Sequence, residues 1–304
     1  RPPHDAIRAL NRMAQVGETN WLLEADITAF FDSIDRAMLM EMLQHRVADG
    51  SLLRLIGKCL HVGVLDGEEY TTPDEGTAQG SVISPMLGNI YLHYVLDRWF
   101  ENEVKPRLRG KATLVRYADD FVIGFETRED AERVVAVLHQ RMKKYRLSLH
   151  PDKTRLLAFG RPSNGTTGHG GSATFDFLGF THYWRRTLGG KWAVACKTRR
   201  GRLGRAIKAV YDWCRSHRHL EVKAQHAALV SRIEGHFNYF GVNGNTSSIA
   251  SLVHWARRAW HKWLNRRSQR SRMTWERFRN LLKSFPLPVP RVKVVIWHRA
   301  YRKT

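Results

Sequence analysis

The sequence predicts an α+β body followed by a domain built only of helices. Up to about residue 185, short apolar runs of strand length alternate with segments whose apolar residues recur at helical spacing. After about residue 198 only the helical spacing remains. The charge changes in the same part of the chain. Residues 1–180 hold 22 Lys and Arg against 24 Asp and Glu, whereas residues 181–304 hold 28 against 4. We therefore expect a charge-balanced body joined to a strongly basic helical domain.

Local spacing predicts the elements of the body. Asp35 precedes an apolar helical run and can cap it, and Ser84-Pro85 begins a stronger helix with proline in its first turn. The apolar runs on both sides of Asp119-Asp120 have the length and composition of two strands joined by a tight turn. In chain order we expect a helix over 4–16, a strand over 21–27, a helix from Asp35, a helix over 51–60, a hairpin over 63–76, a helix over 84–104, a hairpin over 112–125, a helix over 128–145, a strand over 156–159 and a closing hairpin over 175–196.

The basic domain is expected to contain four helices and a short extended tail. Apolar residues recur at helical spacing around Val210, Ile233, Leu252 and Phe278. The stretch 285–290 places proline at every second position and cannot be helical.

Positive charge on the third of these helices and just beyond it lies off the apolar stripe. Its members are Arg257, Arg258, Lys262, Arg266 and Arg267. The chain also has ten Trp, several of them in the basic part, which supply faces for stacking. Together these features predict that the basic domain binds nucleic acid. The alternative is a basic face that is merely solvated.

Several classes of protein are disfavoured. No uninterrupted apolar run approaches the ~20 residues of a membrane helix, and the N-terminus shows no signal peptide. The three widely separated cysteines fit neither a disulfide framework nor a zinc site, which favours a reducing compartment. We expect a cytoplasmic protein that associates with nucleic acid and not with a membrane.

Three acidic residues are candidates for a metal site. An isolated Asp119-Asp120 turn would ordinarily be a solvated hairpin tip. Asp26, however, stands near the end of a buried strand in the same body. If that strand neighbours the hairpin, three carboxylates converge, and their mutual repulsion requires compensation by cations. Such a set suits two Mg²⁺ ions, which prefer oxygen ligands and can support an in-line displacement at phosphorus.

Five segments occur in the order and at the spacing of the catalytic motifs of reverse transcriptases. Tyr117-Ala118-Asp119-Asp120 resembles the Tyr-x-Asp-Asp box of that family. The other four are Asp26-Ile27-Thr28-Ala29-Phe30-Phe31-Asp32, the Gln-Gly-x-x-x-Ser-Pro-like segment from Ala78 to Ile90, Leu149-His150-Pro151-Asp152-Lys153-Thr154, and Phe177-Leu178-Gly179-Phe180. Together they are far more specific than the Asp-Asp pair alone.

The resemblance implies a right-hand polymerase. Its palm, an antiparallel sheet with packed helices, would cover residues 1–185, and an all-α basic thumb or maturase (X) domain would cover 186–284. An extended basic tail would follow over 285–304. Asp26, Asp119 and Asp120 would be the catalytic residues and would hold two Mg²⁺ ions.

The resemblance also implies roles in nucleotide binding. Gln79 would contact the incoming nucleotide or the template, and Lys153 would neutralise phosphate. Phe31, or alternatively Phe30, would stack under the sugar and select dNTPs, while the other ring packs in the core. The alternatives are a loop amide for Gln79 and an ordinary surface lysine for Lys153.

Two later segments resemble the maturases of group II introns. The segment from Arg232 to Phe240 is similar to Arg-Gly-Trp-x-Asn-Tyr-Tyr, with His236 where Trp is usual, and Trp263-Leu264-Asn265-Arg266-Arg267 is similar to the Trp-Leu-x-Arg-Arg that follows it. The implied function is an RNA-directed DNA polymerase of group II intron type. Its partners would be an RNA template or intron RNA, a DNA primer and dNTPs, and the C-terminal domain would assist splicing.

Two other functions stay open. One is an RNA-binding splicing cofactor without polymerase activity. The other is an inactive remnant, because the family's fingers strands precede the segment with which this chain begins. The first residue is Arg1 and not Met, so we expect the chain to be cut, and we expect no Cys/His-rich endonuclease tail.

Overall fold

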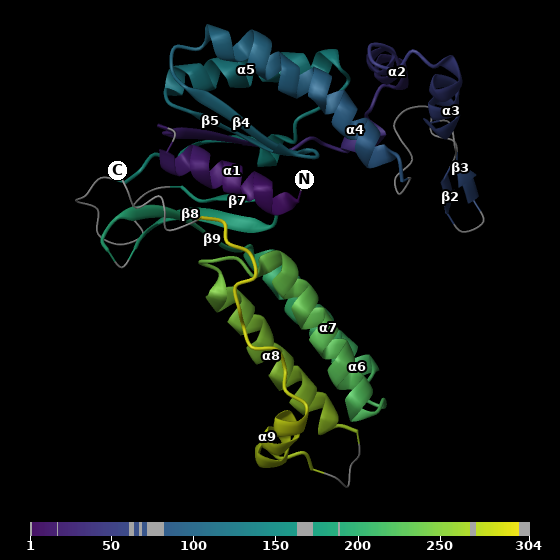
Figure 1. Ribbon diagram of the computed structural model, residues 1–304, viewed down its shortest axis with the longest axis vertical. Coiled ribbons are helices and arrows are strands. Elements are labelled where there is room, and N and C mark those ends of the chain that lie inside the picture. Colours follow the sequence, from purple (N-terminus) through teal and green to yellow (C-terminus); the bar gives the residue numbers. More distant parts are fainter. Residues whose placement is uncertain are drawn as a thin grey trace. The chain divides into compact units, whose positions relative to one another are not determined.

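The computed structural model shows an α+β unit and a mainly helical unit, as the sequence predicts (Figure 1). The first unit comprises Arg1–Phe177 and Arg186–Ala193, and the second comprises Leu178–Arg185 and Val194–Thr304. The residues that the structure describes are 2–16, 18–60, 64–66, 69–71, 82–162, 173–187, 189–267 and 272–297. No helix among them is long and apolar enough to cross a lipid bilayer.

A four-stranded antiparallel sheet forms the centre of the first unit, in the order β4-β5-β1-β6. The strand predicted near the N-terminus is thus the direct neighbour of the predicted hairpin. That adjacency is the condition on which the candidate metal site depends. The strands are β1 (Trp21–Ala25), β4 (Ala112–Tyr117), β5 (Asp120–Phe125) and β6 (Arg155–Ala158).

Helices cover both faces of this sheet (Figure 1). On one face, Phe121 and Phe125 of β5 join a core with Leu138 of α5 (Arg128–Lys144). On the other, Gly124 meets α1 (Pro3–Val16), where an added Cβ would lie 2.7 Å from the Sδ atom of Met13. The alternation of side chains along β5 therefore sets which helix packs on which face.

The remaining elements of the first unit follow the predicted order. Asp35 caps its helix as expected, because its carboxylate accepts a hydrogen bond from the Met38 amide at 2.8 Å. In the helix predicted to begin at Ser84-Pro85, Ile83 occupies the N-cap position without a side-chain hydrogen bond, so Ser84 lies within the first turn and not at the cap. These elements are α2 (Arg36–Gln44), α3 (Gly50–Leu60), β2 (Val64–Asp66), β3 (Glu69–Thr71) and α4 (Ser84–Leu92), then π-helical turns at His93–Asp97 and Phe100–Val104, a 3₁₀ turn at Lys105–Arg107, another at Pro151–Lys153, and β7 (Phe175–Phe177).

The chain passes into the second unit within β7, β8 (Phe180–Arg186) and β9 (Trp192–Thr198), which are neighbours in one sheet. Four helices follow, as predicted: α6 (Arg200–Ser216), α7 (Val222–Phe240), α8 (Thr246–Leu264) and α9 (Trp275–Ser284). Their core surrounds the fully buried Trp260, whose indole N–H donates to the Gln225 side-chain oxygen at 2.9 Å. The buried amide of Gln225 is thereby satisfied, as a buried polar group must be.

The described part of the tail is extended, as the prolines require, and it packs on the second unit. Leu287 and Ile296 are buried, and Val294 forms a parallel bridge with Val242 after α7. Glu234 of α7 pairs with Lys293 of the tail. The tail is therefore held by both apolar burial and charge.

Candidate active site and nucleic-acid surface

The register of the sheet brings two of the three predicted catalytic aspartates to facing positions. Ala25 of β1 pairs with Phe121 of β5, so the next positions in the same antiparallel register are Asp26 and Asp120. Residues that face each other across an antiparallel pair project to the same side of the sheet. Asp26 and Asp120 therefore share one face at one end of the sheet.

Asp119 lies in the turn that joins β4 to β5. The pairing of Tyr117 with Asp120 leaves Ala118 and Asp119 as the two turn residues. The prediction that Asp119-Asp120 forms the tip is corrected here, because Asp120 is already the first residue of the strand. Ala118 has a φ of 54°, the left-handed conformation that two-residue hairpins require at their first turn position.

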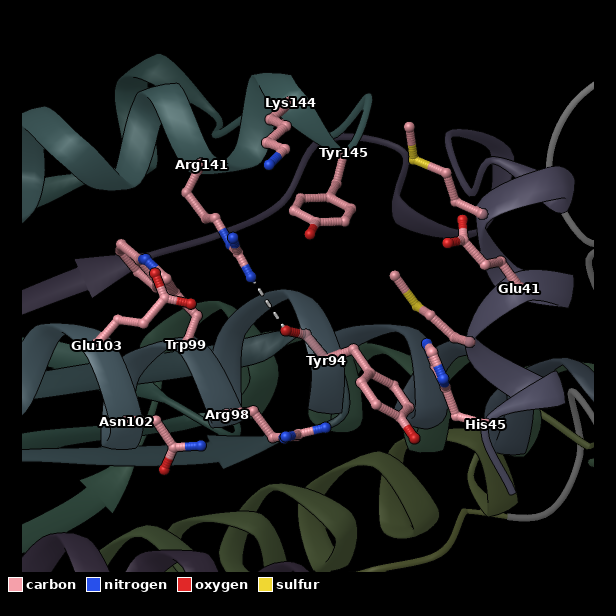
Figure 2. A pocket seen from close by; sticks show the side chains of 12 residues that line it. Glu41, His45, Tyr94, Arg98, Trp99, Asn102, Glu103, Arg141, Lys144 and Tyr145 are labelled. Carbon is pink, nitrogen blue, oxygen red and sulfur yellow. Dashed lines mark hydrogen bonds between the residues drawn. The ribbon is translucent and has the colours of Figure 1, made fainter. Parts of the chain in front are cut away.

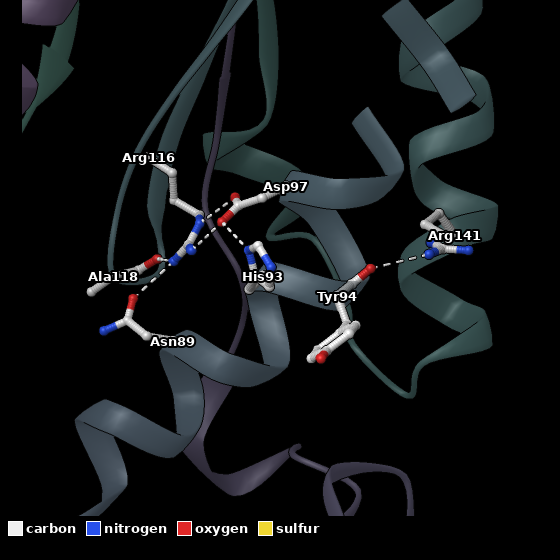
Figure 3. Close-up of polar contacts among 7 residues, drawn as sticks. All are labelled: Asn89, His93, Tyr94, Asp97, Arg116, Ala118 and Arg141. Carbon is white, nitrogen blue, oxygen red and sulfur yellow. Dashed lines mark hydrogen bonds and ion pairs between the residues drawn. The ribbon is translucent and has the colours of Figure 1, made fainter. Parts of the chain in front are cut away.

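The Arg116 side chain holds this turn by hydrogen bonds to several partners (Figure 3). Its guanidinium binds both carboxylate oxygens of Asp97, at 2.7 and 2.5 Å, and donates to the Ala118 carbonyl at 2.8 Å. It also donates to the Asn89 side-chain oxygen of α4 at 3.0 Å. The Arg116 side chain is only 12% exposed, so these bonds form largely out of water. The helix after the Gln-Gly motif and the turn that carries Asp119 are thus joined by one side chain.

Local sequence assigns no role to Arg116. A signal was nevertheless present, because this cation stands three residues before a pair of aspartates at a tight turn. The structure shows, however, that Arg116 pairs with Asp97, 19 residues earlier in the chain. That partner could not be identified from local spacing.

Lys153 lies against Asp26, the first of the predicted catalytic aspartates. Its Nζ atom is 2.5 Å from the Asp26 carboxylate, whose side chain is 23% exposed. The backbone fixes this approach, because the His150 amide donates to the Asp26 carbonyl at 2.8 Å and a short 3₁₀ turn then carries Lys153. Lys153 was predicted to neutralise phosphate, and here its charge compensates a carboxylate.

The donor chemistry of the three aspartates suits Mg²⁺, since all three offer carboxylate oxygens on one end of the sheet. Among the residues that the structure describes, however, no three acidic, His or Cys side chains are gathered closely enough to hold a metal. Asp26 is turned to Lys153 instead. A cation bound here would have to take the place of that ammonium group.

Glu24 is a further carboxylate on the same face, two residues before Asp26. Burial raises the pKa of Glu24, while the Arg155 guanidinium at 2.7 Å and the Asp176 amide at 3.3 Å act to lower it. Arg155 stands directly across from it in β6. Glu24 is therefore paired with a cation across the sheet.

The two phenylalanines predicted near the sugar differ in burial. Phe30 is buried, and Phe31 is half-buried with its ring centroid 5.1 Å from that of Phe30. Both rings press on Gly88 of α4, where an added Cβ would lie 2.8 Å from Phe30 and 3.2 Å from Phe31. Gln79, the other predicted nucleotide contact, lies outside the described residues.

A hollow of about 400 Å³ lies elsewhere on the first unit, between α2, the π-helical turns after α4, and α5 (Figure 2). Arg141 spans it and donates to the Tyr94 carbonyl at 3.3 Å. Its lining carries both signs of charge, since Glu41 and Glu103 accompany Arg98 and Lys144. The hollow contains none of the predicted catalytic residues.

The predicted RNA-binding cations are all exposed on the second unit. Arg258 lies over the Trp255 ring, 5.5 Å from its centroid, and Lys262 donates to the Tyr211 hydroxyl at 2.7 Å. Arg267 differs, because it donates to the carbonyls of His219 and Leu220 between α6 and α7. The other two members, Arg257 and Arg266, also have exposed side chains, and the Arg266 guanidinium lies over the Trp263 ring.

The maturase-like motif lies on α7. His236 stacks on Phe240 with ring centroids 4.5 Å apart, and burial lowers the pKa of His236 to about 4. Tyr239 donates its hydroxyl to the Leu178 carbonyl at 2.9 Å, and Asn238 accepts from Lys293 at 2.8 Å. Much of this motif therefore serves to pack α7 against neighbouring segments of its own unit.

Comparisons with known proteins show the family to which the chain belongs. A model of the family described as reverse transcriptase (RNA-dependent DNA polymerase) matches residues 1–182. Protein YkfC of Escherichia coli K12 is 32% identical over 191 residues, 51% of this chain and 49% of that protein. The group II intron-encoded protein LtrA of Lactococcus lactis subsp. cremoris is 27% identical over 223 residues, 54% of this chain and 36% of that protein.

A likeness among solved structures concerns the fold alone. The telomerase of Candida albicans, solved with a TWJ fragment of telomeric RNA, shares 14% identity at a TM-score of 0.50, covering 98% of this chain and 46% of that one. The chain spans about half or less of the length of its first curated relatives. The predicted α+β polymerase fold and the resemblance to group II intron proteins are confirmed. The chain belongs to the reverse transcriptase (RNA-dependent DNA polymerase) family.

Proposed function

We propose that this chain is the palm and thumb of an RNA-directed DNA polymerase of the group II intron type. The palm corresponds to residues 1–185, the thumb to 186–284 and the tail to 285–304. The observation that carries the proposal is the register that sets Asp26 opposite Asp120, beside a turn that holds Asp119 and is braced by Arg116. A solvated hairpin tip needs neither the facing aspartate nor the brace.

In this proposal Asp26, Asp119 and Asp120 hold the metal. Two Mg²⁺ ions bound there would activate a primer 3′-hydroxyl and stabilise the departing pyrophosphate. Lys153 compensates the Asp26 carboxylate while the site holds no cation. When a nucleotide enters, the ammonium group of Lys153 leaves Asp26 and binds a phosphate of that nucleotide instead. The exposed side chain of Lys153, 59% accessible, leaves it room for that exchange.

In this proposal Phe31 is the residue that selects the sugar of the incoming nucleotide. Phe30 is the core ring, and Phe31 keeps part of its surface outside the core. Gly88 allows both rings to approach α4, so it sets where the Phe31 ring can stand. Gln79 remains the predicted contact to nucleotide or template.

Primer extension on an RNA template, with dNTPs and Mg²⁺, tests the polymerase. We expect extended DNA from the natural protein and none above background from Asp119→Ala. Undiminished product from Asp119→Ala, or no product from the natural protein at any Mg²⁺ concentration, would reject the polymerase and leave the splicing cofactor or the inactive remnant.

A second function, binding of intron RNA by the basic domain, is favoured by the exposed cations on α8. Neutralising Arg257, Arg258 and Lys262 together should weaken RNA binding and reduce the slope of log affinity against log salt by about two to three. A matched triple variant at Arg54, Lys58 and Lys143, exposed cations of the first unit, should leave that slope nearly unchanged. Equal slopes for both variants would contradict the assignment.

A further inference from the structure

A pocket of about 320 Å³ opens in the second unit between α6, α8 and α9. One face of α8 supplies Trp255, Arg258, Ala259 and Lys262, at positions i, i+3, i+4 and i+7. The remaining lining residues are Ile207, Tyr211, His261 and Trp275. The pocket is thus a mixture of aromatic rings and cations, and none of its lining residues is acidic.

Two tryptophans present open surface at this pocket. Trp255 is 46% exposed and Trp275 is 51% exposed, which is unusual for so large an apolar side chain. Trp275 is nevertheless held in place, because His261 stacks on it with ring centroids 3.8 Å apart. The His261 ring is itself fixed by a 2.7 Å hydrogen bond between its Nε2 atom and the Met273 carbonyl. Trp275 is therefore a supported ring whose surface is still half open.

The cations of the pocket are held beside its rings. Arg258 lies 5.5 Å from the Trp255 centroid, and Lys262 contacts the hydroxyl of Tyr211. Neither contact neutralises the charge, so each cation can still attract an anion. The hollow on the first unit differs, since two glutamates line it.

We propose that this pocket receives one unpaired nucleotide of the bound RNA, its base stacking on Trp275 or Trp255 and its phosphate meeting Arg258 and Lys262. The inference rests on the proposed RNA binding and adds a preference for RNA with an extruded base. Stacking accepts any base, because every base has a π-face, so the preference concerns structure and not sequence. The volume also fits a small group and not a duplex, which must be gripped along its backbone.

The test uses two RNA stems of equal length, one fully paired and one with a single unpaired 2-aminopurine. A terminal dye reports affinity by anisotropy, and 2-aminopurine emission reports stacking. The natural protein should bind the bulged stem on the order of tenfold more tightly and quench its emission. Trp275→Ala should lose most of the preference for the bulged stem and most of the quenching. Trp255→Ala should lose part of both. Both variants should bind the paired stem as the natural protein does. Trp275→Phe should restore part of both.

Further variants separate stacking from charge. Arg258→Gln and Lys262→Gln should each lower the salt slope by about one, which the tryptophan variants should not do. Trp213→Ala, which removes a half-buried tryptophan outside the pocket, is the matched control and should keep the bulge preference.

The outcomes distinguish this inference from the proposed function beneath it. Equal binding of both stems by the natural protein, or a preference that survives both tryptophan-to-alanine changes, overturns the pocket but leaves RNA binding standing. Failure to bind either stem overturns RNA binding and the pocket together.

Discussion

The two units use positive charge in opposite ways. In the first unit, cations near the proposed catalytic end of the sheet pair with carboxylates, as Arg116 does with Asp97 and Lys153 with Asp26. Residues 181–304 have only 4 acidic residues for 28 cations. There, Arg258 and Lys262 lie beside aromatic rings or a hydroxyl. A paired cation fixes geometry, whereas an unneutralised cation is available to a polyanion. The comparison is consistent with the proposal that cations position groups in the first unit and bind RNA in the second.

The largest expected effect separates chemistry from binding. Asp120→Asn removes one charge from the catalytic end of the sheet and should lower primer extension by roughly 10²–10³-fold, as loss of a preorganised electrostatic group does. RNA affinity should stay within about twofold, because the binding cations lie in the other unit. Asp152→Asn, a change at an exposed acid beside Lys153, is the matched control for both assays. A parallel fall in RNA affinity would break the division of labour between the units.

The brace on the catalytic turn should show the next largest effect. Arg116→Lys keeps the charge but loses the fork that binds Asp97 and the Ala118 carbonyl together. We expect a loss of about 2 kcal/mol in the free energy of unfolding, measured in urea, since bonds to charged groups contribute about 1.5–3 kcal/mol.

A double-mutant cycle with Asp97→Asn checks whether that loss belongs to the pair. The two single changes should cost less together than the sum of their separate costs, because each removes the same interaction. Strict additivity would mean that Arg116 and Asp97 act independently and that the brace is wrong.

The fold, and the strands that position Asp26 and Asp120, were predictable because they follow local patterns. Alternation around Asp119-Asp120 indicated the hairpin, and the apolar run before Asp26 indicated the strand beside it. The order of the five motifs indicated that this strand and the hairpin are neighbours, which residue spacing alone did not. Long-range side-chain pairs were not predictable, as Arg116 with Asp97 shows, because their partners are chosen by packing. The turn consists of Ala118 and Asp119, one residue earlier than the predicted Asp119-Asp120. The register of β4 and β5 determines this position, and the acidic pair does not.

A pH effect is expected from the second unit. Burial lowers the pKa of His236 to about 4 from an ordinary value of 6.5, so between these values the unfolded chain binds more protons than the folded one. Stability from the neutral ring is complete above about pH 6.5 and is lost as pH falls toward 4. A pKa shift of this size corresponds to a loss of about 3 kcal/mol in the free energy of unfolding at low pH. Partial exposure of the His236 ring reduces the expected loss to about 1–2 kcal/mol.

Urea unfolding at pH 7.5 and pH 5 measures this effect. His236→Phe keeps a ring against Phe240 and should show a smaller loss between the two pH values than the natural protein. His254→Gln, at an exposed histidine of α8, should lose as much as the natural protein. The same loss in His236→Phe would show that the buried imidazole is not the source.

The smallest expected effect concerns the tail of the second unit. There Glu234 pairs with cations, as Asp97 and Asp26 do in the first unit. Glu234 accepts from Lys293 and Arg291, and the hydrogen bond from Lys293 is the main cause of its lowered pKa. Glu234→Gln should speed cleavage of the tail in limited proteolysis by a few-fold, because a partly exposed ion pair contributes up to about 1 kcal/mol. Since the carboxylate stays ionised below its ordinary range, the difference should persist at pH 5, where His236 already reduces stability. Glu276→Gln, at an exposed acid of α9, should not change the cleavage rate. If Glu234→Gln leaves the rate unchanged as well, the ion pairs of Glu234 do not hold the tail, and apolar burial of Leu287 and Ile296 with the backbone bridge at Val294 does.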